Sequence, residues 1–344
     1  MKVLVTANHT PFIAGGANYH VEGLVKALRQ YGHQVECLRL PFHYGEAQIE
    51  RQMNFAEQLD LGAPNDVSID RVISLQFPTY GVQHPEHVVW LMHQHRVCYE
   101  LYDPAQASPA LVALKPHVEA YDKRHLGQAK RLFANSPRVA ERLKHYCGLS
   151  ARPLYHPPHQ AEQFVCGDDW GYVFYPSRLE PLKRQSLLIE AMALTQTPVM
   201  LLLTGKGSQQ RSLEQQVERL GLGNRVRFLG HTSEQEKRTL YAHALAVAFP
   251  TFDEDYGYVT LEAMLASKPV ITCTDSGGPT AFVEHGVTGW QCPPTPQAIA
   301  AALDEAYVDR SKAKRMGEQG REAYQEANIS WHQVVTKLVY EESI

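Results

Sequence analysis

Two glutamates, Glu254 and Glu262, stand at the ends of the short segment EDYGYVTLE. The residues around Glu262 are mostly apolar, so its carboxylate is expected among core side chains, where an unpaired charge is costly. A helix that begins at Gly257 leaves Glu254 in the preceding loop and puts Tyr258 and Glu262 on one face, because their spacing is i, i+4. Two carboxylates held apart in this way can bind different parts of one polyol ligand, whose neighbouring hydroxyls would satisfy the buried oxygens of Glu262.

Three further segments follow apolar stretches and could bind an anion. In PSRLEPLKR, Arg178 and Lys183 bracket a proline-stiffened loop, and this pair of cations suits a diphosphate, although a solvated basic loop has the same composition. The Gly15-Gly16 pair precedes a helix and could present backbone amides to an anion, but a turn that needs positive φ explains it equally well. The segment TGKGS, residues 204–208, lacks the spacing of a Walker loop or a dinucleotide fingerprint, so it predicts neither a nucleoside triphosphatase nor a dehydrogenase.

These segments lie in a chain that alternates short apolar strands with amphipathic helices. Strands are expected at residues 3–6, 35–40, 71–75, 88–92 and 131–134, and then at 172–175, 199–204, 226–229, 245–249 and 269–272. Helices are expected after Gly16, at 109–128 and 137–147, and then at 184–195, 209–220, 233–243, 257–266, 311–326 and 330–341. This alternation predicts an α/β fold with two doubly wound, Rossmann-like domains and a ligand cleft between them.

The proline-rich run 152–159 is interpreted as the linker between the two domains. We therefore expect an N-terminal domain at 1–158 and a C-terminal domain at 159–326. The remaining segment, 327–344, is expected to form a helix that packs back across the junction.

The composition is that of an ordinary globular protein. The 344 residues are 44% hydrophobic and 20% charged, and the net charge of -4 gives no reason to expect nucleic acid as a partner. Six scattered cysteines without a Cys-x-x-Cys pair favour free thiols in a reducing compartment. We expect no signal peptide and no membrane-spanning segment, and hence a cytoplasmic location, with peripheral contact to the inner face of the membrane left open.

The segment EDYGYVTLEAMLASKPVITCTDSGG, with its E-x7-E spacing, resembles the family-four glycosyltransferases, the large "group one" family with the GT-B fold. The resemblance also takes in PSRLEPLKR, LLLTGKG, VRFLGH and VEHGVTGW, so it covers most of the C-terminal half. The N-terminal half is similar more loosely, through GGANYHVEGLVKALRQYGHQV and ANSPRVAERL. One E-x7-E is common by chance, whereas the whole ordered set is not.

The resemblance implies a retaining, metal-independent hexosyltransferase without a cofactor. Its donor would be a nucleoside-diphosphate sugar, which makes 159–326 the nucleotide-sugar-binding domain. Its acceptor would be a glycan, a lipid-linked molecule or a small molecule, which makes 1–158 the acceptor-side domain. Base rates favour envelope or exopolysaccharide synthesis. The base, the sugar, the acceptor, the pathway and the oligomeric state are not readable from the residues.

The resemblance also implies roles for individual donor-binding residues. Glu262 would hold the ribose hydroxyls and Glu254 the donor sugar, while Arg178 and Lys183 would bind the diphosphate. The other implied donor contacts are Gly16 in the N-terminal domain and the helix N-terminus formed by Gly257, Tyr258 and Val259.

On the catalytic side, the resemblance points to Glu254 and to His93, which ends the strand in VVWLMHQHR. His95 stands two residues further on and is an alternative counterpart. In one departure from the family pattern, Ala281 occupies the place of the glutamate in G-G-x-x-E.

Three competing interpretations remain. The DED triplet at 253–255 fits the metal-binding Asp-x-Asp of GT-A transferases, but those enzymes have one sheet domain rather than two. A nucleotide-sugar 2-epimerase would share the fold, and would release an epimer without any acceptor. A non-catalytic sugar-nucleotide binder would keep the donor contacts alone.

Overall fold

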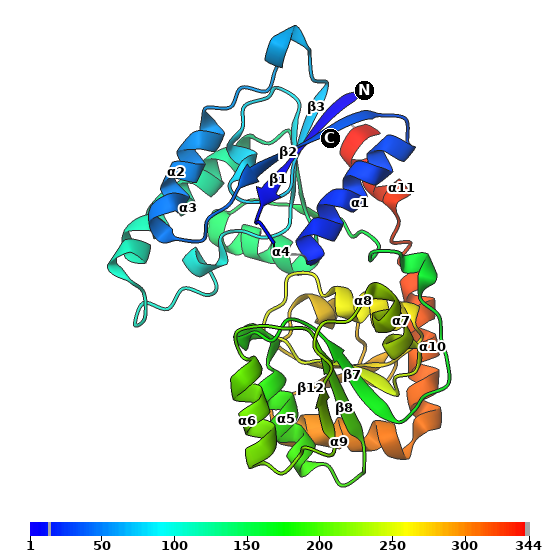
Figure 1. Ribbon diagram of the computed structural model, residues 1–344. Helices are drawn as coiled ribbons and strands as arrows, with labels where there is room; N and C mark the ends of the chain where they lie inside the picture. The colour runs from blue at the N-terminus through cyan, green and yellow to red at the C-terminus, as the bar shows by residue number, and fades with distance from the viewer. Residues whose placement is uncertain (13–14, 341–344) are drawn as a thin grey trace. The chain divides into compact units, whose positions relative to one another are not determined.

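The computed structural model describes residues 1–12 and 15–340, and Figure 1 shows their arrangement. By its internal contacts the chain divides into an N-terminal unit, Met1–His156 with the chain from Ser330 on, and a C-terminal unit, Pro157–Ile329. The last helix was expected at 330–341, so its final residue lies outside the described residues. Among the described residues, no helix is both long and apolar enough to cross a membrane.

The N-terminal unit is built on a six-stranded sheet in the order β2-β1-β3-β4-β5-β6, in which every pairing is parallel. Its strands are β1 (Lys2–His9), β2 (Gln34–Pro41), β3 (Arg71–Ser74), β4 (His87–Leu91), β5 (Arg131–Ala134) and β6 (Arg152–Pro153). The chain first adds β2 on one side of β1 and then adds β3 on the other. The order therefore reverses between β1 and β3, which is where sheets of this kind bind ligands, beyond the carboxyl ends of the strands.

Helices cover both faces of this sheet (Figure 1). They are α1 (Gly16–Gln30), α2 (Glu46–Glu57), α3 (Pro109–Gln128), α4 (Pro137–Arg142) with the turn Leu143–Cys147, and α11 (Trp331–Val335) with the turn Thr336–Tyr340. The apolar stripe Val21, Leu24 and Leu28 of α1 packs with α11 against one face, although α11 lies at the far end of the sequence. The side chains of α2 and α3 pack against the other face.

The C-terminal unit repeats this plan with a second parallel sheet, in the order β12-β11-β10-β7-β8-β9. Its strands are β7 (Tyr172–Pro176), β8 (Met200–Thr204), β9 (Val226–Phe228), β10 (Ala246–Phe249), β11 (Val270–Cys273) and β12 (Gly289–Cys292). Its helices are α5 (Gln185–Leu194), α6 (Gln210–Arg219), α7 (Glu234–Ala242), α8 (Tyr258–Leu265), α9 (Pro296–Val308) and α10 (Arg310–Glu326). Here the strand order reverses between β7 and β10.

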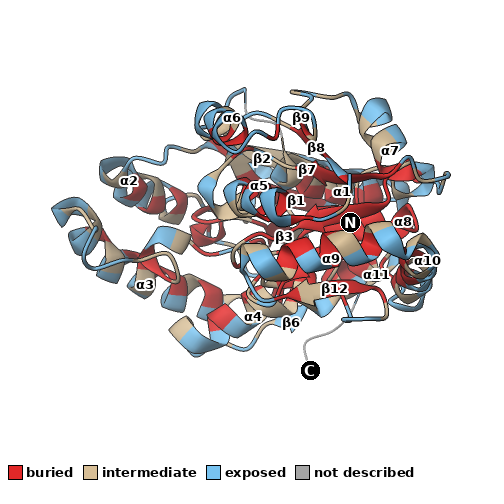
Figure 2. Cartoon of the chain, turned by 90° about the horizontal axis from the view of Figure 1, so that it is seen from below, coloured by how far each residue is buried: buried red, intermediate tan, exposed pale blue. Residues whose placement is uncertain are grey.

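Most residues of the strands are buried, while the helices expose their outer faces (Figure 2). The prediction of two doubly wound α/β domains is confirmed, since all ten expected strands are present within one or two residues at each end except for β1, which runs further. The helices α2 and α9 and the edge strands β6 and β12 were not expected. β6 lies within the proline-rich run interpreted as a linker, and only two of its residues pair with β5. The expected interdomain cleft stays a prediction.

Candidate functional site

The strand order of the C-terminal sheet reverses between β7 and β10. Each of these two strands is followed by one of the charged segments singled out above. The loop after β7 carries Arg178 and Lys183, and the loop after β10 carries Glu254. Because β7 and β10 are parallel neighbours, their carboxyl ends meet at one edge of the sheet. Residues far apart in the sequence are thereby brought to one place.

Lys183 and Glu254 form an ion pair across this reversal point. The ammonium Nζ of Lys183 lies 2.5 Å from Oε2 of Glu254, and the two side chains are only 16% and 22% exposed. The ammonium also lies 5.5 Å from the ring centroid of Phe249, and the backbone of Lys183 accepts a hydrogen bond from the hydroxyl of Tyr175. The cation expected at the diphosphate and the carboxylate expected at the sugar are thus in direct contact.

The two arginines of the same loop differ in their surroundings. Arg178 is exposed, and among the described residues its guanidinium has no hydrogen-bond or ion-pair partner, so it is available to a ligand. Arg184 instead makes a two-pronged pair with Asp275, at 2.8 and 2.7 Å, which ties the loop after β7 to the loop after β11. The hydrogen bonds that Arg184 donates to Asp275 raise the pKa of Arg184. The sequence offered no signal for this pair.

Glu262 is 6% exposed and finds its donors within the protein. The ammonium of Lys237 lies 3.1 Å from Oε1, and the hydroxyl of Tyr241 donates to Oε2 at 2.7 Å. Lys237 is also paired with Glu234 at 3.0 Å, and these neighbouring carboxylates help to raise its pKa despite the burial that opposes it. Each carboxylate oxygen of Glu262 keeps a second lone pair, so a ligand hydroxyl can still be accepted. Lys237 and Tyr241 were missed, although their i, i+4 spacing puts them on one face of an expected helix.

The helix α8 starts one residue later than expected, with Gly257 as its N-cap in a left-handed conformation, φ 85°. Burial and then the negative charge of Glu262, one turn further along α8, raise the pKa of Tyr258. Val259 is buried in the same first turn. The partial positive charge of this helix end points toward the loop that holds Glu254.

The Gly277-Gly278 pair explains how that loop keeps its shape. The amide of Glu254 donates to the Ser276 carbonyl at 2.9 Å, and the Gly278 amide donates to the Glu254 carbonyl at 2.7 Å. A Cβ on Gly277 would lie 2.6 Å from the Glu254 carbonyl oxygen, and one on Gly278 would lie 2.7 Å from that of Tyr256. Only glycine permits so close a backbone approach. Ala281, which replaces the family glutamate, is exposed.

The segment TGKGS has a similar structural role. A Cβ on Gly205 would lie 2.2 Å from the Ser177 carbonyl oxygen, and a Cβ on Gly207 would lie 2.2 Å from that of Leu179. The two glycines therefore let the loop after β8 pack against the loop that carries Arg178. This accounts for the Gly-x-Gly spacing without a nucleotide fingerprint.

In the N-terminal unit, Gly16 begins α1 and Gly15 is its N-cap. Neither glycine has positive φ in the left-handed region, and a Cβ on Gly15 would meet nothing within 4 Å. The alternative explanation for this pair, a need for positive φ, therefore applies to neither glycine. The helix end follows β1, beside the reversal point of this sheet.

The two candidate histidines follow β4 and have different environments. His93 is exposed, and its Nδ1 lies 2.7 Å from the carbonyl oxygen of Gln94. His95 is half-buried and stacks on Phe77 with ring centroids 5.1 Å apart, and burial lowers its pKa to about 4. His95 is therefore a packed, neutral side chain, whereas His93 is accessible.

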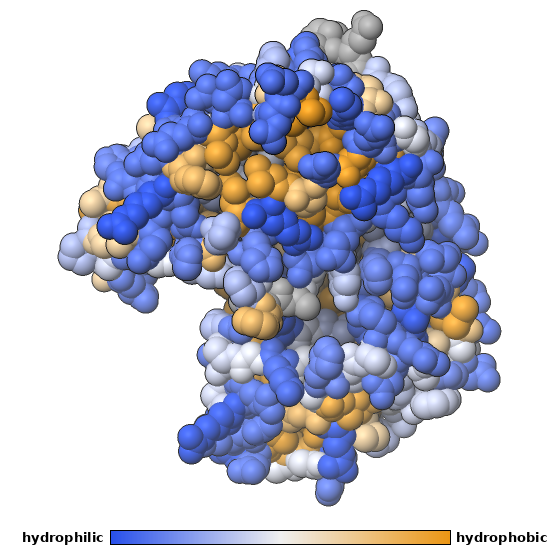
Figure 3. Space-filling view, turned by 45° about the horizontal axis from the view of Figure 1, so that its top comes forward, coloured by the Kyte–Doolittle hydropathy of each residue, from blue (hydrophilic) through white to orange (hydrophobic). Residues whose placement is uncertain are grey.

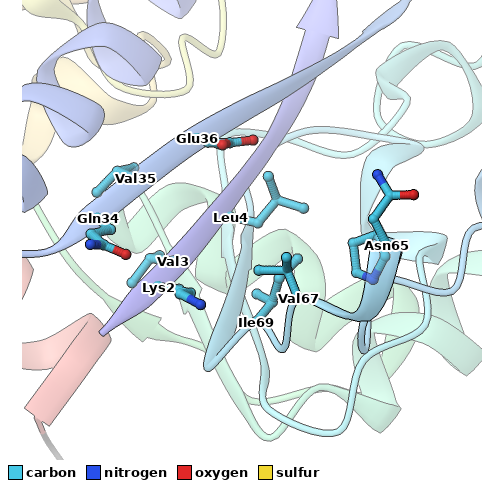
Figure 4. A pocket seen from close by; sticks show the side chains of 10 residues that line it. Lys2, Val3, Leu4, Gln34, Val35, Glu36, Asn65, Val67 and Ile69 are labelled. Atoms are coloured by element: carbon cyan, nitrogen blue, oxygen red, sulfur yellow. The ribbon is translucent and has the colours of Figure 1, made fainter.

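Two cavities, one in each unit, lie away from these residues. One cavity of about 580 Å³ lies at the amino ends of β1 and β2, lined by Lys2, Gln34 and Val67 among others (Figure 4). Apolar side chains also gather on the N-terminal unit in Figure 3, and Val67 is 47% exposed. A second cavity of about 580 Å³ lies at the amino ends of the C-terminal strands, beside Lys268. Each cavity therefore lies at the amino ends of its strands, whereas the candidate residues follow the carboxyl ends.

Within the described residues, no group of three or more His, Cys, Asp or Glu side chains could hold a metal ion. This includes the surroundings of the DED triplet at 253–255. The six cysteines are all free.

Comparison with known proteins gives the family of the C-terminal unit. Residues 161–323 match the family model described as Glycosyl transferases group 1. The chain carries a group 1 glycosyltransferase domain. Arg178, Lys183, Glu254 and Glu262 all lie inside the matched stretch of this domain.

Similar proteins extend over both units of the chain. An uncharacterized glycosyltransferase of Methanocaldococcus jannaschii, MJ1607, is 22% identical over 90% of each chain. A sucrose-phosphate synthase of Thermosynechococcus elongatus superposes with a TM-score of 0.81 at 21% identity, over 97% of each chain. HepE of Anabaena, in a structure with UDP-glucose, superposes with a TM-score of 0.70 at 20% identity, over 97% of this chain and 98% of that one. At these identities the structures establish the GT-B fold alone.

Proposed function

We propose that this glycosyltransferase is a retaining enzyme that moves a hexose from a nucleoside-diphosphate sugar to a hydroxyl acceptor. The observation that carries the proposal is the Lys183–Glu254 pair at the β7/β10 reversal point, with the exposed Arg178 on the same loop. A cation and a carboxylate in contact suit a ligand that joins a diphosphate to a sugar. The HepE structure with UDP-glucose supports a donor of this class.

In this proposal each group acts on one part of the donor. Arg178, Lys183 and the N-terminus of α8 bind the diphosphate and stabilise the charge that it acquires as the bond to the anomeric carbon breaks. Glu262 accepts from the ribose hydroxyls and Glu254 from the sugar hydroxyls. Gly16 and His93 contribute from the N-terminal unit.

The reaction itself exchanges one bond for another. The bond between the anomeric carbon and the diphosphate oxygen breaks, and the electron pair leaves with the diphosphate. The acceptor oxygen bonds to the same face of the anomeric carbon, and its proton passes to the departing phosphate oxygen. The acceptor class, a glycan, a lipid-linked or a small molecule, and a place in envelope or exopolysaccharide synthesis belong to the same proposal.

A panel of nucleoside-diphosphate sugars tests the donor class. A bound donor stabilises the folded protein and so raises its melting temperature. At a donor concentration of 100 times Kd, the free energy of unfolding increases by about 2.7 kcal/mol. We expect one base and sugar to stand out, and acceptor screening with that donor to release the nucleoside diphosphate. NMR of the product should show the anomeric configuration of the donor, and an inverted product would contradict retention.

The same experiment separates the two alternatives. A 2-epimerase would convert the donor to an epimer without an acceptor. A non-catalytic binder would show the melting shift and no turnover with any acceptor. An absence of any melting shift across the panel would overturn the proposal.

A further inference from the structure

Gln94 stands between the two candidate histidines and anchors the loop that carries them. It is 3% exposed, whereas His93 is exposed. Its amide Nε2 donates to Oδ2 of Asp122 at 3.3 Å and lies 3.2 Å from Sγ of Cys147. Because the Gln94 side chain is held inside, the adjoining His93 is directed outward, and its Nδ1 is in contact with the Gln94 carbonyl.

Asp122, on α3, is the centre of this anchor. Its side chain is fully buried, and it accepts hydrogen bonds from the hydroxyls of Tyr80, at Oδ1, and Tyr99, at Oδ2 with a distance of 2.8 Å. Tyr80 lies in the turn Thr79–Gly81 after β3, and Tyr99 follows the turn Arg96–Cys98 after β4. One carboxylate therefore ties together the loops at the carboxyl ends of two neighbouring strands.

A purely structural purpose explains this arrangement poorly. A buried charge with its hydrogen-bond partners is often no more stabilising than apolar residues of the same volume. Burial raises the pKa of Asp122 to about 6, so its ionised form is disfavoured in this place. What the carboxylate does supply is direction, since its three donors fix the loops around His93 relative to the sheet.

We propose that Asp122 is a positioning residue that acts through Gln94 to hold His93 in the orientation needed for sugar transfer. This inference rests on the proposed function, in which His93 contacts the donor sugar. Supporting groups of this kind hold the side chains that touch the substrate, and a misplacement of about 1 Å can slow a reaction by about 100-fold.

A double-mutant cycle between Asp122 and His93 tests the inference. Asp122→Asn keeps the size of the side chain but puts an amide where three donors converge, so at least one hydrogen bond is lost. We expect it to lower kcat by at least ~10-fold with the KM for the donor changed by less than about twofold. His93→Ala alone should slow transfer at least ~100-fold. Asp122→Asn introduced into the His93→Ala variant should lower kcat by less than about a further twofold.

The outcomes of the cycle separate the inference from the proposed function. If the double variant loses the product of the two single effects, Asp122 acts independently of His93 and the positioning role is wrong. If His93→Ala turns over at the wild-type rate, the role of His93 in the proposed function is wrong, and the positioning role is wrong with it. If Asp122→Asn leaves kcat unchanged, only the positioning role is wrong.

Two further variants keep the test free of folding effects. Gln94→Met removes the amide but leaves Asp122 with both tyrosine donors, so it should reproduce the loss of kcat even if Asp122→Asn does not fold. Wild-type kcat in a folded Gln94→Met variant would overturn the inference. Ser74→Ala is the matched control, because it removes other buried hydrogen bonds of this unit. They join Ser74 Oγ to Thr6 Oγ1 and to His87 Nε2, both at 2.7 Å, and to the Thr79 carbonyl at 3.4 Å. It should lower the melting temperature without changing kcat.

Discussion

At the scale of single residues, Glu254 has two partners. Its carboxylate is paired with the Lys183 ammonium in the structure, and we propose that it binds the sugar when the donor is present. Glu254→Gln removes the negative charge that competes with a diphosphate for Lys183. We expect the free nucleoside diphosphate to bind as well as before or more tightly, while transfer slows at least ~100-fold. Calorimetric titration and turnover assays measure the two effects separately.

The matched control for this variant is Asp169→Asn, which neutralises the carboxylate paired with Arg310 at the opposite edge of the same sheet. It should change neither quantity. Clearly weaker diphosphate binding by Glu254→Gln would show that Glu254 contacts the nucleotide rather than the sugar.

Glu262 belongs to the same scale, because both of its oxygens already accept from protein donors. Glu262→Ala removes the proposed ribose acceptor and should weaken both donor and free nucleoside diphosphate by roughly 2–3 kcal/mol, the value typical of a charged hydrogen bond. Tyr241→Phe disturbs the same carboxylate but leaves it in place, so its effect on titrated affinity should be much smaller. Equal affinity of the Glu262 variant and the wild type would rule out the ribose assignment.

At the scale of elements, α1 is held to its sheet partly through a neutral histidine. His20 is 2% exposed, stacks on His156 with centroids 4.1 Å apart and meets the edge of Trp90 at 4.1 Å. Burial lowers its pKa to about 3, while an unfolded chain titrates near 6.5. Its contribution to stability is therefore complete above about pH 6.5 and is lost as the pH falls toward 3. Between pH 7.5 and 5, one such histidine costs about 2 kcal/mol of unfolding free energy.

Urea unfolding of the wild type and of His20→Phe at several pH values measures this loss. The phenylalanine variant should show a flatter decline of stability between pH 7.5 and 5. The lowered pKa of His156 also reduces stability as the pH falls. The raised pKa of Asp122 acts in the opposite direction, because it stabilises the folded state as the pH falls through about 6. Parallel pH profiles for the two proteins would contradict the assignment to His20.

At the scale of the whole molecule, the proposed reaction relies on fixed cations in place of a divalent metal. Arg178 and Lys183 come from the loop after β7 and the α8 N-terminus from the loop after β10, and together they would stabilise the leaving diphosphate. Turnover should therefore survive EDTA, measured after extensive dialysis. Complete loss of activity that manganese restores would instead assign a metal-binding role to the DED triplet.

Residues close to one another in the sequence determined where most strands and helices of this protein form. Apolar runs of four or five residues and helical stripes such as Val21, Leu24 and Leu28 placed the strands and helices, because burial on a sheet needs those local periods. The E-x7-E spacing and the Gly257 helix start likewise lie within one short segment. The edge strand β6 was missed because only two of its residues pair with β5. The helices α2 and α9 were missed although each buries residues at helical spacing, such as Ile49 and Met53 in α2.

The tertiary structure alone decided which of these residues meet. Lys183 and Glu254 are 71 residues apart, and Arg184 and Asp275 are 91 residues apart. Each pair forms because β8 and β9 lie on one side of β7, and β10 then pairs with its other side. The donors of Glu262 come from α7, and the anchor of Gln94 comes from α3. Sheet order is set by the packing of whole elements, and no spacing within a short segment encodes it.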